Sequence, residues 1–387
     1  MLNFEIDRKY LVEVLQGLVR INSVNPALVE DAPGEAEIAG YTAQLMQDLG
    51  LEVHRHEPSP GRVSVVGRLP GQGQGRSLML NAHYDTVGVE GMPEPFSARI
   101  QDGRLYGRGA YDMKASLAAS LAALKALQEA GCRPLGDVLI AAVADEEHAS
   151  LGTADLIPRY PVDAAIVTEP SQLEICLAHK GFMWLQVETQ GRAYHGSRPD
   201  EGIDANMHMG CFLYRLQALE RELRRRPPHR LLGPPSLHAA QVKGGTSPSI
   251  YAASCTLTVE RRTIPGESAE QVEEEIRSIL ERLEKEDPDF KASLQVGLVR
   301  EPFEVSPRAK IVGALETACR DVLGCIPPHA GQNPWMDSAL LSAAGVETVV
   351  FGPSGAGAHS DNEWVDLDSV HSLSAILAQT TAAYCDE

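Results

Sequence analysis

Val138-Leu-Ile-Ala-Ala-Val-Ala-Asp-Glu-Glu147 is an apolar run that stops at three consecutive carboxylates. A run of small and β-branched residues this short predicts a central strand covered on both faces. Adjacent residues on a strand point to opposite sides, so Glu146 and Glu147 can have different roles if the chain turns there, one binding a metal ion and the other moving a proton. A solvated acidic turn is the alternative that this stretch alone leaves open.

Strands and helices alternate around this stretch. Apolar residues at helical spacing predict helices at 7–19, 35–49, 115–130 and 309–322. Short runs of apolar and β-branched residues predict strands at 52–55, 63–68, 77–80, 164–168 and 348–351. The alternation predicts an α/β fold, a mostly parallel sheet with helices on both faces.

The pattern changes between residues 180 and 297. Strands are expected at 183–189, 237–242, 253–260 and 292–297, with helices at 205–225 and 268–283. The resulting β-α-β-β-α-β order is that of a ferredoxin-like α+β unit. The chain is therefore expected to form one α/β domain, residues 1–179 and 298–387, interrupted by an inserted domain, residues 180–297.

Composition limits the partners. The 34 Lys+Arg against 53 Asp+Glu give a formal charge of -19, which argues against nucleic acid and anionic membrane surfaces but not against small anionic substrates. The seven cysteines show no close-paired spacing, which fits reduced thiols better than disulfides. The sequence shows neither an apolar run of about 18 residues nor a signal-peptide pattern at its start. We expect a soluble cytoplasmic protein.

Histidines and carboxylates follow several of the predicted strands. His83, Glu146, Glu147 and Glu169 each come just after the end of a predicted strand, and His359 lies in the Gly-rich loop after the last one. Ligands bind at that edge of an open α/β sheet. Two imidazoles and several carboxylates suit zinc, cobalt or manganese, and a ligand set without cysteine favours a catalytic site over a structural one.

The order of motifs resembles a known family over nearly the whole chain. The motifs are His83-x-Asp85, Gly107-Arg-Gly-Ala-Tyr-Asp112-Met-Lys114, Asp145-Glu-Glu147, Thr168-Glu169-Pro170 and the late His359. They resemble the di-zinc metallopeptidase family of acetylornithine deacetylase, succinyl-diaminopimelate desuccinylase, aminoacylase and glutamate carboxypeptidase. The resemblance implies a zinc-exopeptidase-like catalytic domain and an inserted lid and dimerisation domain.

The resemblance also implies two divalent metal ions, zinc first and cobalt or manganese as alternatives. It implies that His83, Asp112 and Glu169 hold one ion. It implies that Asp112, Glu147 and His359 hold the other, so that Asp112 bridges the pair. A shared carboxylate lowers the repulsion between two dications about 3.5–4 Å apart.

Three further roles follow from the resemblance. Glu146 is expected to be the general base, which takes a proton from water and returns it to the leaving amine. Asp85 is expected to fix the tautomer and orientation of His83. A cis peptide bond is expected between Asp112 and Met113.

The inserted domain resembles the family's lid. His195, in Tyr194-His-Gly-Ser, matches the residue that reaches the neighbouring subunit's active site and stabilises the oxyanion, which implies a homodimer through this domain. Arg262 is expected to bind a substrate carboxylate, whereas a salt bridge at the strand end is the preferred interpretation of Arg261. Gly357 is expected to bring backbone N–H groups close to the substrate.

Other positions depart from the family or are expected to be structural. Asp204 and Ala339 stand where the family usually has Asn and Arg, and Thr246 follows Gly244-Gly where many members have Asn. These positions belong to the substrate-facing parts of the pattern. Phe182 and Trp184 are expected in the core of the insertion, and Cys176, Cys255 and Cys319 are expected to be small core residues.

The sequence therefore predicts a metal-dependent amidohydrolase that removes an acyl group from an amino acid or a small relative. A carboxypeptidase or dipeptidase with the same machinery is the nearest alternative, because both cut an amide beside a carboxylate. A non-catalytic protein that binds metal or amino acid is a third possibility. The sequence does not specify the acyl group or the amino-acid side chain of the substrate. It also does not specify the metal used in the cell or assembly beyond a dimer.

Overall fold

The computed structural model describes residues 4–386 and divides them into two compact units. Unit 1 comprises the chain up to Leu177 together with Val305–Ala330 and the residues from Met336 onward. Unit 2 comprises Ala178–Glu304 and Gly331–Trp335. The sequence analysis ended the insertion at residue 297, which lies inside strand β12 (Lys291–Arg300), whereas unit 2 continues to Glu304.

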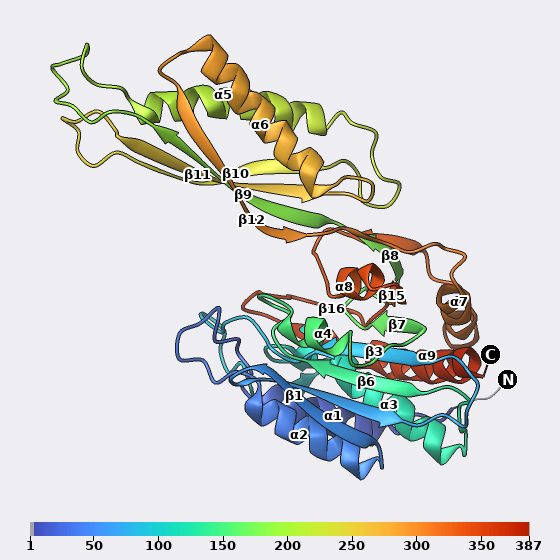
Figure 1. Cartoon of the computed structure of the whole chain (residues 1–387). Helices are drawn as coiled ribbons and strands as arrows, with labels where there is room; N and C mark the ends of the chain where they lie inside the picture. The colour runs from blue at the N-terminus through green and yellow to red at the C-terminus, as the bar shows by residue number, and fades with distance from the viewer. Residues whose placement is uncertain (1–3, 387) are drawn as a thin grey trace. The chain divides into compact units, whose positions relative to one another are not determined.

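The central sheet of unit 1 has a parallel centre and antiparallel edges (Figure 1). Its strand order is β1-β2-β6-β3-β7-β15, and β15 then pairs with the start of β8 through Val350 and Cys176. Strands β6, β3, β7 and β15 run parallel, and the β1–β2 hairpin joins β6 antiparallel. The strands are β1 (Glu52–Ser59), β2 (Arg62–Leu69), β3 (Leu78–His83), β6 (Val138–Val143), β7 (Ala164–Val167), β8 (Ile175–His179) and β15 (Glu347–Val350).

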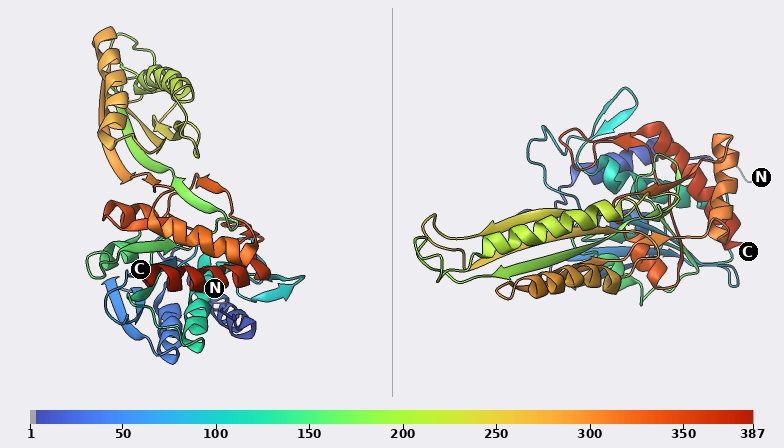
Figure 2. Two further views of the ribbon diagram at one scale, coloured as in Figure 1. Left: turned by 90° about the vertical axis from the view of Figure 1, so that its right-hand side faces the viewer. Right: turned by 90° about the horizontal axis from the view of Figure 1, so that it is seen from above.

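Helices cover both faces of this sheet, as the sequence predicted (Figures 1 and 2). One face carries α1 (Arg8–Arg20), α2 (Ala36–Asp48), α3 (Ala115–Glu129), α7 (Lys310–Leu323) and α9 (Leu367–Cys385). The other face carries the short helices α4 (Leu151–Leu156) and α8 (Ser338–Ala343). Strand β6 is buried along its whole length, which explains its unbroken apolar sequence.

Local sequence signals end and begin several of these helices. Asp7 caps α1 by accepting a hydrogen bond from the Tyr10 amide, and Gly50, at a φ of 70°, follows α2. Helix α9 was not predicted, although Asp366 precedes it and accepts a hydrogen bond from the Ser369 amide at 2.8 Å. An N-cap aspartate before an apolar run was therefore the signal that could have revealed this helix.

A small second sheet in unit 1 packs against the segment that carries Asp112. Its order is β16-β17-β5-β4, formed by β4 (Arg99–Gln101), β5 (Arg104–Tyr106), β16 (Gly355–Ala356) and β17 (Trp364–Asp366). Strand β5 leads into a π-helical turn, η1 (Ala110–Lys114), which carries Asp112. The peptide bond between Asp112 and Met113 is cis, as the family resemblance implied.

Unit 2 is an α+β unit with the ferredoxin-like order. Its elements are β9 (Gly181–Gln190), α5 (Ala205–Leu223), β10 (Ser236–Gly244), β11 (Ser254–Thr263), α6 (Ala269–Glu286) and β12 (Lys291–Arg300). The sheet order is β10-β11-β9-β12, and every neighbouring pair is antiparallel. Short strands β13 (Phe303–Glu304) and β14 (His329–Gln332) pair with β8. The expected β-α-β-β-α-β order is confirmed.

Both helices of unit 2 pack on one face of its sheet (Figure 1). Met183, Leu185 and Val187 of β9 point into that core. The alternation of a strand therefore places Phe182 and Trp184 on the opposite, open face, and Trp184 is 45% exposed. The expectation that these two aromatic residues lie in the core was wrong, because they are out of phase with the apolar residues of β9.

The cysteines follow the prediction: Cys176, Cys255 and Cys319 are buried, and within residues 4–386 no cysteine is in a disulfide. Within residues 4–386 no helix is both long enough and apolar enough to cross a lipid bilayer.

Candidate active site

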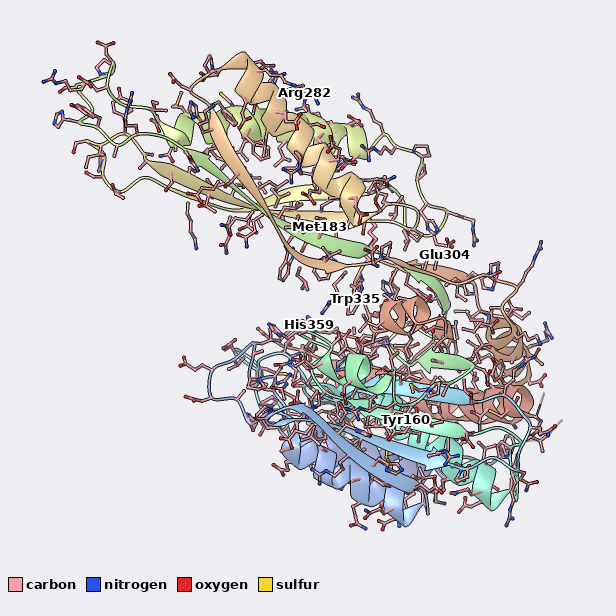
Figure 3. All side chains as sticks on the ribbon, viewed as in Figure 1. Tyr160, Met183, Arg282, Glu304, Trp335 and His359 are labelled. Atoms are coloured by element: carbon pink, nitrogen blue, oxygen red, sulfur yellow. The ribbon has the colours of Figure 1, made fainter. Side chains whose placement is uncertain are left out.

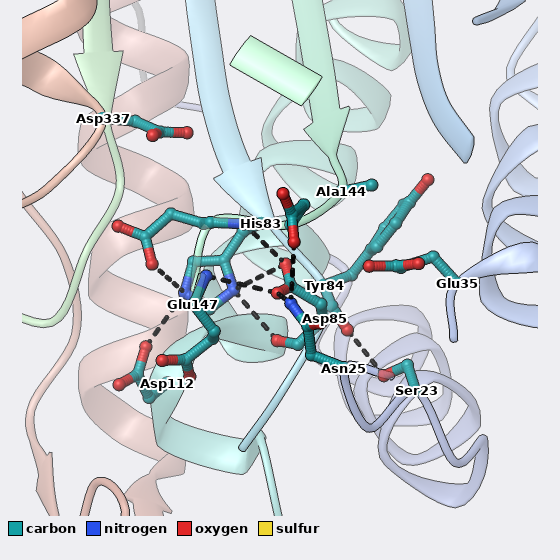
Figure 4. Close-up of polar contacts among 12 residues, drawn as sticks. Ser23, Asn25, Glu35, His83, Tyr84, Asp85, Asp112, Ala144, Glu147 and Asp337 are labelled. Atoms are coloured by element: carbon teal, nitrogen blue, oxygen red, sulfur yellow. Dashed lines mark hydrogen bonds and ion pairs between the residues drawn. The ribbon is translucent and has the colours of Figure 1, made fainter. Parts of the chain in front are cut away.

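Three neighbouring strands of unit 1 end at the same edge of the sheet. His83 is the last residue of β3, Glu146 and Glu147 follow β6, and Glu169 follows β7. Strand β3 runs parallel to both of the other strands, so their carboxyl ends meet at one edge. The close-up in Figure 4 shows His83 and Glu147 near Asp112.

Asp112 connects the two histidines. Its Oδ1 lies 3.1 Å from Nε2 of His83, and its Oδ2 lies 3.3 Å from Nε2 of His359. Nε2 of His359 also lies 3.0 Å from a carboxylate oxygen of Glu147. Each oxygen of one carboxylate thus faces a different imidazole, which is the arrangement that a carboxylate shared by two metal ions requires.

Two further carboxylates, those of Glu169 and Glu146, lie near the same nitrogen of His83. Its Nε2 lies 3.5 Å from an oxygen of Glu169 and 3.9 Å from an oxygen of Glu146. Potential ligand atoms of His83, Asp112 and Glu147 lie within 4.8 Å of one another, and so do those of His83, Glu146 and Glu169. The structure therefore brings together the six residues that the sequence analysis grouped as five ligands and a base.

The site carries an excess of buried negative charge. Burial, and then the neighbouring Glu169, raise the pKa of Glu146 well above its usual value. Burial is also the main cause that raises the pKa of Glu169 and of Glu147. Within residues 4–386, no lysine or arginine forms an ion pair with these three carboxylates or with Asp112.

The same negative charge raises the pKa of both histidines. Burial alone would lower the pKa of His83, but Glu169, Asp112 and Glu146 raise it well above its usual value. Hydrogen bonds to Asp112 and Glu147 raise the pKa of His359 to about 10. The four carboxylates are largely buried, His83 is buried and His359 is exposed. Two imidazoles and four carboxylates form a donor set that divalent cations would neutralise. The residues present thus fit a two-metal site.

Asp85 supports the site through the backbone. Its carboxylate accepts hydrogen bonds from the amides of Glu146 and Glu147, at 3.1 and 3.2 Å, and from Nδ2 of Asn25 at 2.8 Å. Nδ1 of His83 lies 3.0 Å from the backbone carbonyl of Asp85 but 3.7 Å from its carboxylate. His83 is therefore oriented mainly by the carbonyl, while the carboxylate holds the loop that carries Glu146 and Glu147.

Glu363 is a buried residue of this site that the sequence analysis missed. Its carboxylate accepts hydrogen bonds from the amides of Gly109, Tyr111 and Asp112, at 2.9 to 3.1 Å, and pairs with Arg108 at 2.7 Å. It therefore fixes the η1 turn that presents Asp112. No local motif marked Glu363, because its partners lie about 250 residues earlier in the chain.

Gly357 lies two residues before His359 and has a φ of 85°. A Cβ at this position would lie 2.0 Å from the backbone oxygen of Asn362, so the loop requires glycine for its own packing.

The remaining candidates belong to unit 2. His195 is exposed, and its Nδ1 lies 2.8 Å from Oγ of Ser197. Arg261 is buried and pairs with Glu267 and Glu275, which confirms the salt-bridge interpretation. Nε of Arg262 donates to Glu260 at 2.7 Å. The catalytic and binding roles of His195 and Arg262 stay predictions.

Comparisons with known proteins identify the family. The profile of Peptidase family M20/M25/M40 matches residues 79–383. An acetylornithine deacetylase of Myxococcus xanthus is 31% identical over 377 residues, covering 93% of each chain. An N-formyl-4-amino-5-aminomethyl-2-methylpyrimidine deformylase of Bacillus subtilis (strain 168) is 27% identical over 413 residues, covering 98% of this chain and 96% of the relative.

Solved structures share the fold at low identity. A tripeptidase of Staphylococcus aureus has a TM-score of 0.81 at 19% identity and covers 99% of this chain and 100% of that one. A dinuclear metal binding peptidase of the M20 family from Bacillus subtilis has a TM-score of 0.76 at 16% identity, with coverages of 97% and 98%. With the matched profile and the relative at 31% identity, these findings establish that the chain is a hydrolase that belongs to peptidase family M20/M25/M40.

Proposed function

We propose that the chain hydrolyses the amide bond of an N-acyl amino acid and that Glu146 is the general base. The observation that carries the proposal is the pair of overlapping ligand groups that share His83, with Asp112 between the two histidines. A hydrolase site with this donor set is typical of metal-assisted attack by water on a carbonyl.

The proposed ligand sets are those that the family resemblance implies, and short distances between their members support them. His83, Asp112 and Glu169 would hold one divalent ion. Asp112, Glu147 and His359 would hold the other. When bound, two such ions would acidify a water molecule and polarise the substrate carbonyl. Nitrogen and oxygen ligands without cysteine favour zinc, with cobalt or manganese as alternatives.

Glu146 has the position that a general base needs. Its side chain is largely buried, and its amide is fixed by Asp85, so its carboxylate has a defined place beside His83. It would accept the proton of the attacking water and then donate it to the amine that leaves. Asp85 would act by holding the loop in place.

The acyl amino acid is proposed from the relatives. The Myxococcus xanthus relative is named as a deacetylase and the Bacillus subtilis relative as a deformylase, so both names describe removal of a small acyl group from nitrogen. A carboxypeptidase or dipeptidase is the alternative, since several solved structures of this fold are named as peptidases. A non-catalytic binding protein is the third possibility. It would predict a lost ligand or base, and none of the six residues is missing.

Unit 2 is proposed as the lid and as the surface through which two copies form a homodimer. Strand β10 lies at the edge of its sheet, and most of its residues are exposed. Met207 and Tyr214 on the outer side of α5 are 70% and 72% exposed. An open strand edge beside exposed apolar residues suits pairing with a second copy. In such a dimer, His195 would stabilise the oxyanion in the partner's site, and Arg262 would bind the substrate carboxylate.

The test is hydrolysis of a panel of N-acetyl, N-succinyl and N-formyl amino acids and dipeptides by chelator-treated protein, before and after addition of zinc, cobalt or manganese. Activity that depends on added metal would support the proposal, and the preferred substrates would separate a deacylase from a peptidase. Binding of metal without turnover of any substrate would favour the non-catalytic alternative.

Glu146→Gln sharpens this test. We expect it to lower kcat by about 10²- to 10⁴-fold, because proton transfer is lost, while the metal content stays at the wild-type value. Glu129→Gln, an exposed position on α3, is the matched control and should leave kcat unchanged. Near-normal turnover by Glu146→Gln would contradict the assigned base.

A further inference from the structure

The open face of the unit 2 sheet carries aromatic and cationic side chains in adjacent positions. Phe182 lies at the centre of a row across the sheet, with Arg262 of β11 opposite it on one side and Arg300 of β12 on the other. Side chains opposite each other on adjacent strands have Cβ atoms about 4.5–5.5 Å apart. Trp184, two residues further along β9, occupies the next row on the same face, opposite Glu260.

The side chains of these rows contact one another. The guanidinium carbon of Arg262 lies 5.2 Å from the ring centroid of Phe182, and the rings of Phe182 and Trp184 are 5.4 Å apart. Arg300 stacks on Trp335, the residue labelled in Figure 3, at 5.0 Å. We call these five side chains the aromatic–arginine platform.

Hydrogen bonds hold parts of the platform. Glu260 accepts from Nε1 of Trp184 at 2.9 Å and from Nε of Arg262 at 2.7 Å. Nε1 of Trp335 donates to the carbonyl of Glu301 at 3.1 Å. Within residues 4–386, the bond to Glu260 is the one hydrogen bond that Arg262 makes, which leaves the terminal nitrogens of its planar fork for a ligand.

The charge of this face is opposite to that of the chain. The protein carries a formal charge of -19, yet the platform contains two arginines, one of which, Arg262, pairs with Glu260. Two guanidinium groups on one face attract anions and repel ammonium groups.

We propose that the aromatic–arginine platform binds small aromatic carboxylates. The flat faces of Phe182 and Trp184 suit a planar ring, and the guanidinium groups of Arg262 and Arg300 suit a carboxylate. One consequence rests on the proposed function, in which Arg262 binds the substrate carboxylate: the N-acyl amino acids that the chain hydrolyses carry aromatic side chains. A cationic side chain such as that of ornithine is disfavoured by the same two guanidinium groups.

Tryptophan fluorescence gives a direct measurement of binding. The chain has three tryptophans, and two of them, Trp184 and Trp335, belong to the platform. The third, Trp364, is in unit 1, where it stacks on Arg104 at 3.9 Å. Trp364→Phe therefore leaves a protein whose emission reports on the platform. Titrations use metal-stripped protein, so that no substrate is turned over.

We expect N-acetyl-phenylalanine to change this emission with saturation, and to bind at least about tenfold more tightly than N-acetyl-ornithine or N-acetyl-phenylalanine amide. Arg300→Gln should weaken binding by about tenfold or more. Arg215→Gln is the control, because Arg215 lies on helix α5 and bonds Glu286 at 2.8 Å. It should bind as the parent does.

Equal affinities for the aromatic and ornithine ligands, or equal losses in the two arginine variants, would overturn the proposal. A failure of the proposed function gives a different pattern, in which N-acetyl-phenylalanine binds to the stripped protein but is not hydrolysed after metal is restored. Hydrolysis without platform-dependent binding would instead support the proposed function and contradict the binding role of the aromatic–arginine platform.

Discussion

Arg62 is the residue whose replacement tests the buried support of the site. Its side chain is 7% exposed, and its Nη2 forms ion pairs with Asp145 and, at 2.9 Å, with Glu35, both of which are buried. Asn25 extends this network, since its Nδ2 lies 3.1 Å from Asp145 and 2.8 Å from Asp85. This series of contacts runs from Arg62 through Asp145 and Asn25 to Asp85, whose carboxylate accepts the amides of Glu146 and Glu147.

Arg62→Met should destabilise the protein strongly. Breaking a buried ion pair by removing one partner costs about 3–5 kcal/mol, because the other charge stays buried without compensation. Burial, and then the charge of Asp85, raise the pKa of Glu35 to about 8, so at neutral pH Glu35 already holds its proton. One unpaired charge, that of Asp145, therefore remains. The expected loss is at the lower end, about 3 kcal/mol.

Arg68→Met is the matched control on the same strand. Arg68 also pairs with two carboxylates, Glu52 at 2.9 Å and Asp137 at 2.7 Å, but it is 38% exposed. Ion pairs in water contribute about 0–1 kcal/mol, so this variant should lose no more than that. The contrast tests burial, because the residue type and the substitution are the same, and the exposed Arg68 has at least as many charged partners as the buried Arg62.

The assay is urea denaturation of the metal-stripped proteins at pH 7, followed by far-ultraviolet circular dichroism. A loss of about 3 kcal/mol is a large part of the ordinary 5–15 kcal/mol of a domain, so the transition midpoint should fall clearly in Arg62→Met and little in Arg68→Met. Arg62→Lys should recover part of the loss, because it restores the charge. Equal midpoints for the two methionine variants would refute the reasoning.

Three further predictions concern the same region. Glu35→Gln should flatten the pH dependence of stability. Folding raises the pKa of the Glu35 carboxyl from 4.5 to about 8, so the wild type loses up to about 1.4 kcal/mol of stability per pH unit as pH rises between those values. Urea unfolding at pH 5, 7 and 9 measures the change. Asp112→Asn should reduce bound metal below two ions per chain by elemental analysis, because the proposed bridge is lost. Asp85→Asn should lower kcat about 10- to 100-fold, since an amide cannot accept from Glu146 and Glu147 through both of its polar atoms; wild-type kcat would contradict this support role.

The sequence could predict that three of the candidate ligands lie close together, because they follow strand ends. His83, Glu147 and Glu169 follow three strands that are parallel and adjacent, so a correct strand assignment was sufficient to bring them together. Asp112 and His359 do not follow from that rule. Their grouping came from the resemblance to the family, since a π-helical turn and a loop at a φ of 60° position them.

The buried residues that support the candidate site could not be predicted in the same way. Glu363 and Arg62 reach the site from elements distant in sequence, and their charges would look like ordinary surface charges in a local window. The open face of unit 2 was missed for a different reason. Phe182 and Trp184 were judged by their hydrophobicity, while the alternation of Met183, Leu185 and Val187 already assigned the two aromatic residues to the other face.

The distribution of charge around the site separates the residues that support it from those that would bind metal. The outer carboxylates have their own cations, since Asp145 pairs with Arg62 and Glu363 pairs with Arg108. Within residues 4–386, the positively charged side chains that pair with the inner carboxylates are all histidines, and burial raises the pKa values of Glu146, Glu147 and Glu169. Positive charge at the centre must therefore be supplied by protons or by bound cations. If cations supply it, their binding free energy adds to the stability of unit 1, by about 2.7 kcal/mol at a concentration of 100 Kd. Chelation should then lower the unfolding midpoint of the wild type more than that of Asp112→Asn, and equal shifts would show that the inner carboxylates do not hold the ions.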